Sequence, residues 1–105
     1  MILTNKTLEH FLDWKVNNKN LSTIEILDFK HLSTTSKNAL IIEFFDSVGV
    51  YIYLETGTYF NKPNFRYKII TNGDTCIGYK EYSRQESTIQ AITKANEIYN
   101  NTDKV

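Results

Sequence analysis

The Asn72-Gly73 pair constrains the fold of this chain more than any other feature, because it lies between two stretches rich in strand-forming residues. Asn and Gly both tolerate the positive φ angles of a type I′ turn. The pair therefore predicts a β-hairpin with strands over residues 65–71 and 75–82.

The register of this hairpin decides which side chains share a face. A three-residue loop places Tyr67 beside Tyr79 and Ile69 beside Ile77. A two-residue loop pairs Tyr67 with Gly78 and gives a poorer apolar match, so we expect the three-residue loop. In that register one face carries Arg66, Lys68, Lys80 and Tyr82, and the other carries Phe65, Tyr67, Ile77 and Tyr79.

Amphipathic patterns predict a helix near each end of the chain. Apolar residues recur at helical spacing over residues 5–16. Ser83 and Glu86 have the spacing of a capping box, which predicts the start of a second helix over residues 84–99. We expect the tail, residues 100–105, to fray.

Three further strands are predicted over residues 22–32, 39–46 and 50–55, the last two joined as a hairpin. Residues 33–38 and 56–64 are expected to form polar connections. The expected fold is a single α+β domain over residues 1–105. It has one antiparallel sheet of about five strands, in the order α-β-β-β-β-β-α, with both helices on one face.

Several positions of the hairpin and the following helix match a family pattern: Phe65-Arg66, Asn72-Gly73-Asp74-Thr75, Tyr82-Ser83, Ile89 and Ile92. With these residues the segment from Val50 to about Ala95 resembles one unit of the YegP-like family of small bacterial domains. The resemblance implies a three-stranded sheet followed by a helix, and no particular activity. The same element order is similar to the small arm-binding domains of phage integrases, which lay a three-stranded sheet in a DNA groove.

Composition narrows the possible functions. The chain has 12 basic and 12 acidic residues, so no overall field attracts nucleic acid or an anionic membrane. Its one cysteine, Cys76, excludes an internal disulfide and a thiol-rich zinc site, and suits a reducing, cytoplasmic compartment. No apolar run approaches the ~20 residues that cross a bilayer. We expect no membrane association and no cofactor.

Candidate catalytic groups are few. Cys76 lies in the middle of a predicted strand without a base nearby in the sequence. His10 and His31 fall on different elements and suggest no metal site. Four carboxylates, which could face one another on neighbouring predicted strands, are Glu25, Asp28, Glu43 and Asp46. A chain of this size cannot easily build the deep cleft of a glycosidase around them, so we do not expect an enzyme.

We expect a binding protein instead. A sheet with both helices on one face leaves its other face open to solvent, and Tyr and Arg on such a face are typical of protein interfaces. Balanced charge favours a protein partner over nucleic acid. The candidate partner-binding residues are Tyr51, Tyr53, Tyr59, Phe60, Lys62, Arg66, Lys68, Lys80 and Tyr82.

Two alternatives stay open. Nucleic acid could be held by Lys62, Arg66, Lys68 and Lys80, with an aromatic ring stacked on a base. An uncovered edge strand would also allow a homodimer. The abundance of Asn, Lys and Ile is typical of AT-rich genomes. It is compatible with a phage- or mobile-element-encoded inhibitor of a host defence system, of the anti-CRISPR or anti-restriction type.

Overall fold

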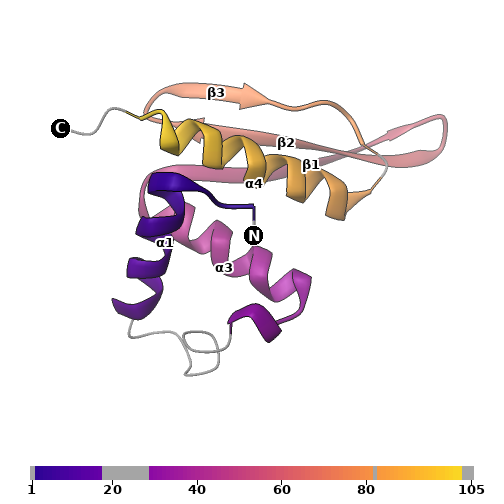
Figure 1. The fold of residues 1–105 in the computed structure, drawn as a ribbon. Coiled ribbons are helices and arrows are strands. Elements are labelled where there is room, and N and C mark those ends of the chain that lie inside the picture. The colour runs from indigo at the N-terminus through magenta and orange to yellow at the C-terminus, as the bar shows by residue number, and fades with distance from the viewer. Residues whose placement is uncertain (1, 18–28, 82, 103–105) are drawn as a thin grey trace.

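The structure of the protein, a computed structural model, describes residues 2–17, 29–81 and 83–102, which form an α+β fold. The helices are α1 (Asn5–Asn17), α3 (Thr34–Ser47) and α4 (Arg84–Asn100), with a short 3-10 helix, η1 (Phe29–His31), before α3. The strands are β1 (Val50–Tyr59), β2 (Lys62–Thr71) and β3 (Asp74–Ile77). Figure 1 shows the strands on one side of the molecule and the helices on the other.

The three strands form one antiparallel sheet in the order β1-β2-β3. β1 and β2 pair along their whole length, from Val50 opposite Thr71 to Tyr59 opposite Lys62. The turn between them, Phe60-Asn61, has φ angles of 50° and 62°. Two positive φ angles are the geometry of a type I′ turn. The prediction of an irregular connection over residues 56–64 is therefore wrong.

Pro63 made that segment look like a loop, but its position in β2 tolerates proline. The Gly78 amide donates to the Tyr67 carbonyl, and Phe65 exchanges two backbone hydrogen bonds with Glu81. The backbone groups of odd-numbered β2 residues thus face β3. Pro63 faces the same way but lies beyond the end of β3, where a missing N–H breaks no ladder bond.

The predicted hairpin at Asn72-Gly73 is confirmed, but the expected register is wrong. Thr71 pairs with Asp74, and the φ angles of Asn72 and Gly73 are 36° and 94°, which makes a two-residue type I′ turn. The Tyr67 ring explains the pairing with Gly78. A Cβ atom at Gly78 would lie 2.1 Å from Tyr67 Cε2, so only glycine leaves room for the ring.

β3 is shorter than the predicted strand over residues 75–82, because a bulge follows it. Tyr67 pairs with Gly78, and Phe65 pairs with Glu81. Between these two pairs β2 advances by two residues, whereas the opposite segment advances by three. The extra residue breaks the regular alternation of sides. Tyr79 and Lys80 lie in this bulge.

The predicted strand over residues 39–46 is wrong, because this segment belongs to α3. Ser33 caps the helix, and its hydroxyl accepts a hydrogen bond from the Ser36 amide at 3.1 Å. The buried side chains follow helical spacing: Leu40, Ile41, Phe44 and Phe45. A short apolar run does not by itself distinguish a strand from a buried helix, and the cap in the supposed loop decided the outcome.

The predicted strand over residues 22–32 is not seen in the part of that segment that the structure describes. Residues 22–28 lie outside the described part, and Phe29–His31 form η1. The sheet therefore has three strands, and the predicted five-strand order is wrong. Helices over residues 5–16 and 84–99 are confirmed as α1 and α4. The expected fraying is wrong at Asn100, which ends α4 and donates to the Thr4 hydroxyl at 3.1 Å, and residues 103–105 are not described.

The helices form two layers beneath one face of the sheet (Figure 1). α4 packs against β1 and β2, α3 packs against β1, and α1 packs against α3 and α4. Small buried residues one helical turn apart, Ser87, Ala91 and Ala95, let α4 lie close to its neighbours. The predicted placement of helices on one side is therefore seen, with α1 in a second layer.

Aromatic side chains fill the space between the helices. Phe11 of α1 lies 5.4 Å from Phe29 and 5.6 Å from Phe44, measured between ring centroids. Polar groups also join the two ends of the chain. The Asn96 side chain accepts from the Thr4 amide at 3.0 Å and donates to the Thr4 hydroxyl at 3.1 Å. These contacts hold the start of α1 on α4. The described helices therefore cover one face of the sheet and leave the other face exposed.

Candidate binding face

Three cross-strand rows make up the face of the sheet that is turned away from the helices, which we call the open face. The first row is Tyr51, Ile70 and Thr75, the second is Tyr53, Lys68 and Ile77, and the third is Glu55 and Arg66. Side chains alternate between the two faces of a strand, so all eight project to the same side.

The side chains of the open face are much more exposed to solvent than those of the face beneath the helices, which we call the covered face. The relative exposure is 44% for Tyr51, 50% for Tyr53 and 52% for Ile77. On the covered face it is 4% for Val50 and 1% for Ile69. The open face thus presents half-exposed aromatic and aliphatic side chains in adjacent rows.

An ion pair occupies the third row. Arg66 Nη2 and Nε donate to Glu55 Oε1 at 2.9 and 3.2 Å. Lys80 reaches this side from the bulge, and a small hollow of about 200 Å³ is lined by Glu55, Arg66 and Lys80 among others. Because Glu55 neutralises the guanidinium locally, this end of the face is polar but not strongly basic.

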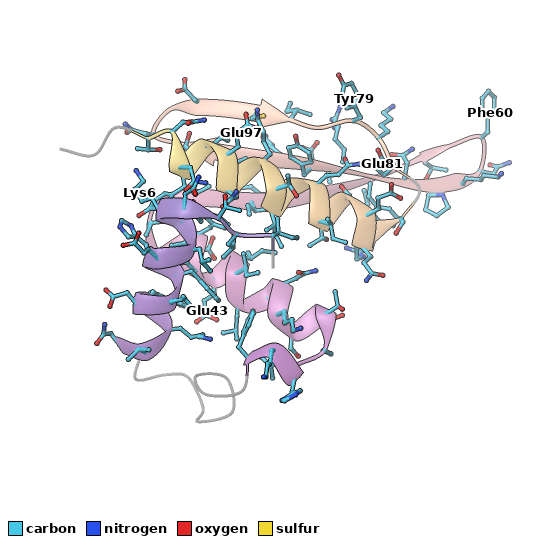
Figure 2. The ribbon with its side chains drawn as sticks, viewed as in Figure 1. Lys6, Glu43, Phe60, Tyr79, Glu81 and Glu97 are labelled. Carbon is cyan, nitrogen blue, oxygen red and sulfur yellow. The ribbon has the colours of Figure 1, made fainter. Side chains whose placement is uncertain are left out.

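The hairpin tip forms a separate exposed region. Phe60 lies at the end of the β1–β2 hairpin with 81% of its surface exposed, and Lys62 beside it is exposed (Figure 2). Neither belongs to the three rows. Tyr59 lies in β1, but its side chain is not described, and Tyr82 lies outside the described residues.

The structure therefore brings together only part of the predicted site. Tyr51, Tyr53, Arg66 and Lys68 share the open face as expected, and Lys80 joins Arg66. The sequence prediction missed Ile77, because the three-residue loop placed it on the covered face, and left Ile70 out of the site. Recognising Asn72-Gly73 as a two-residue turn would have put Ile77 beside Lys68.

Groups with possible reactivity lie elsewhere. Cys76 is half-buried on the covered face opposite Ile69. The pKa of Tyr67 is raised mainly by burial and, to a smaller extent, by the electrostatic interaction with Cys76. His10 Nδ1 lies 2.6 Å from the Tyr99 hydroxyl, far from His31 in sequence. Among residues 2–17, 29–81 and 83–102, no group of three His, Cys, Asp or Glu side chains could hold a metal ion.

The predicted carboxylate group does not assemble as expected. Glu43 and Asp46 lie exposed on helix α3 instead of a strand (Glu43 is labelled in Figure 2). Glu25 and Asp28 lie outside the described residues. The described arrangement on the open face offers stacking, apolar contact and hydrogen bonding, which are the interactions of recognition.

No helix in the described part of the chain is long and apolar enough to span a membrane. Comparison of the chain with models of protein families, with curated proteins and with solved structures gave no match. The resemblance to the YegP-like family therefore stays a prediction.

Proposed function

We propose that this chain is a small, non-enzymatic binding domain that contacts a protein partner through the open face of its sheet. The observation that carries this proposal is the central row, where Tyr53, Lys68 and Ile77 lie side by side on three strands, with Tyr53 and Ile77 about half exposed. An aromatic ring and an aliphatic side chain gain free energy when a partner removes them from water.

The composition of the face favours protein over nucleic acid. Ile70 and Ile77 offer nothing to a phosphate backbone, whereas an apolar patch within a polar rim is the usual anatomy of a protein interface. Arg66 is already paired with Glu55 at 2.9 Å. Nucleic-acid binding depends on several unpaired cations that release counterions, and the balanced charge of the chain supplies no surplus.

A paired capture experiment tests the proposal. The tagged protein serves as bait in the organism that encodes it, beside the variants Tyr53→Ala and Tyr79→Ala. Tyr79 is a matched control because it is 86% exposed but lines a hollow against α4. A partner retained by Tyr79→Ala and lost by Tyr53→Ala supports the open face. A partner lost equally from both variants, or from neither, contradicts it.

Nucleic-acid binding is the second candidate, favoured by Lys68 opposite Tyr53 and by Lys80 beside Arg66 on the same side of the sheet. Electrophoretic shift with duplex and single-stranded DNA at two salt concentrations tests it. If the cations hold phosphates, binding weakens steeply with salt, and Lys68→Gln reduces the salt dependence. Absence of a shift removes this candidate.

The biological context that we propose rests on composition alone. A charge-neutral chain rich in Asn, Lys and Ile fits an inhibitor of host defence encoded by a phage or mobile element. Such inhibitors act by contact, which agrees with a domain built around a recognition face. Genomic neighbours of the gene test this context directly.

A further inference from the structure

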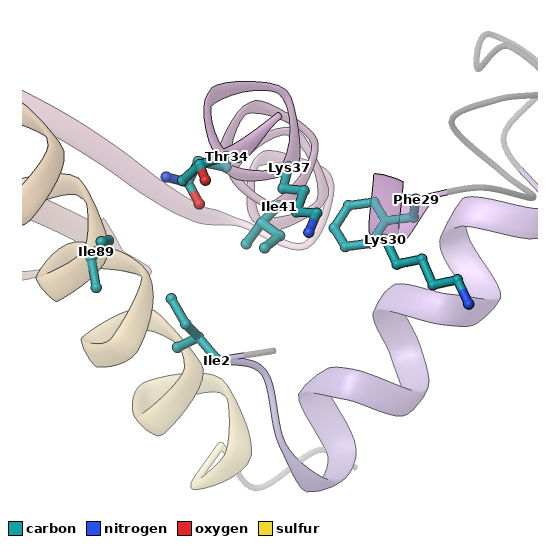
Figure 3. Close-up of a pocket in the computed structure, with 8 residues that line it drawn as sticks. Ile2, Phe29, Lys30, Thr34, Lys37, Ile41 and Ile89 are labelled. Carbon is teal, nitrogen blue, oxygen red and sulfur yellow. The ribbon is translucent and has the colours of Figure 1, made fainter. Parts of the chain in front are cut away.

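A pocket on the helical side of the molecule combines mainly apolar walls with two lysines. It has a volume of about 290 Å³ and lies between the N-terminal segment, η1, α3 and α4 (Figure 3). Apolar side chains form most of its walls: Ile2, Phe29, Ile41 and Ile89. Of the lining residues that the structure describes, Lys30 and Lys37 are charged, and Thr34 and Asn38 are polar and uncharged.

The positive charge is concentrated around Phe29. Lys37 extends between Ile41 and Phe29 in Figure 3, and its Nζ lies 6.0 Å from the centroid of the Phe29 ring. Lys15 Nζ lies 4.6 Å from the same ring centroid, and Lys15 is only 6% exposed. Burial lowers the pKa of Lys15, which packs on the Phe29 ring and is not among the residues that line the pocket.

Among the described residues that line the pocket, the charged ones are Lys30 and Lys37, and their positive charge favours an anion. The apolar walls favour a ligand that also has a hydrocarbon part. A pocket of about 290 Å³ is at the small end for ligand sites and suits a ligand with a short chain.

We propose that this pocket binds a small monocarboxylate with an apolar tail. The carboxylate lies at Lys37, and the tail lies against Ile2, Ile41 and Ile89. This site goes beyond the partner contact proposed above, because it uses the helical side of the molecule and not the open face.

A ligand series on the unmodified protein tests the proposal by two-dimensional ¹H–¹⁵N NMR. The probes are hexanoate, 1-hexanol and hexylammonium at equal ionic strength. Hexanoate produces saturable shifts at the amides of Phe29, Thr34, Ile41 and Ile89. Hexanol binds about tenfold more weakly, since a charge-assisted contact is lost. Hexylammonium gives no saturable shift. Absence of saturation with hexanoate, or equal binding of all three, overturns the proposal.

A charge-removal variant locates the carboxylate. Lys37→Gln keeps most of the side-chain stem and removes the ammonium, so hexanoate affinity falls about tenfold to that of hexanol while hexanol affinity is unchanged. Lys62→Gln, at the exposed hairpin tip, is the matched control and leaves both affinities unchanged. If Lys37→Gln binds hexanoate as tightly as the unmodified protein, the proposal is wrong. The ligand series stands as a test even if this variant folds poorly.

Discussion

The two faces of the sheet differ sharply although they share the same strands. Val50 and Ile69 are almost fully buried beneath α3 and α4, whereas Tyr51 beside Val50 is 44% exposed. The difference teaches that adjacent residues of one strand can have separate roles. Burial of the covered face holds the helices to the sheet, whereas the open face adds little to this core, and under the proposed function it contacts the partner.

Ile69→Ala gives the largest expected effect and tests the division directly. The variant leaves a cavity in the buried face and lowers the free energy of unfolding by about 2–5 kcal/mol. Ile77→Ala removes the same atoms from the open face and costs less than about 1 kcal/mol. Urea denaturation measures both. Equal losses would show that the open face is also covered.

Gly78→Ala tests the covered face at its edge. The added methyl group would lie within 2.1 Å of the Tyr67 ring, so we expect a loss of about 1–3 kcal/mol in the free energy of unfolding. Tyr67→Ala removes the obstacle. In that background Gly78→Ala costs much less, and thermal denaturation of the double variant measures the coupling. Additive losses would contradict the contact.

Tyr53→Ala tests the open face. The ring contributes little to the fold, so the free energy of unfolding changes by about 1 kcal/mol or less. Partner affinity falls at least about tenfold, as expected for an aromatic residue near the centre of an interface. Calorimetric titration with the captured partner measures the affinity. A stability loss as large as that of Ile69→Ala would reverse the assignment of the faces.

Glu55→Gln gives the smallest effect. The two side chains of the Arg66–Glu55 pair are 40% and 41% exposed, so its loss costs about 0.2–1 kcal/mol, and added salt reduces the difference. Denaturation at low and high salt measures it. An effect above that range, insensitive to salt, would mean that the pair is structurally buried.

The C-terminal half of the fold could be predicted from sequence because its signals are local. Asn72-Gly73 specifies a tight turn, and Ser83 caps α4 by accepting from the Glu86 amide at 3.2 Å. The register was not predicted, because the apolar match between Ile69 and Ile77 outweighed the space that Tyr67 requires over Gly78. That requirement depends on where a ring lies in three dimensions.

The central part of the chain could not be predicted in the same way. The run from Ala39 to Asp46 fits a strand or a buried helix equally, and its packing against β1, α4 and α1, together with the Ser33 cap, makes the helix stable. The strand assignment of that run also moved the carboxylates Glu43 and Asp46 to the wrong element. Strand alternation, a local rule, predicts that Tyr51 shares a face with Tyr53 and that Arg66 shares a face with Lys68. That both pairs lie on the open face depends on the register between β1 and β2, which the sequence left open.

Site-specific photo-crosslinking tests the central claim most directly. A photoreactive amino acid replaces Ile77 on the open face or Leu12 on α1, which are 52% and 43% exposed. Illumination in the organism that encodes the protein is expected to give one discrete partner adduct from position 77 and none from position 12. An adduct from position 12 alone would contradict the account.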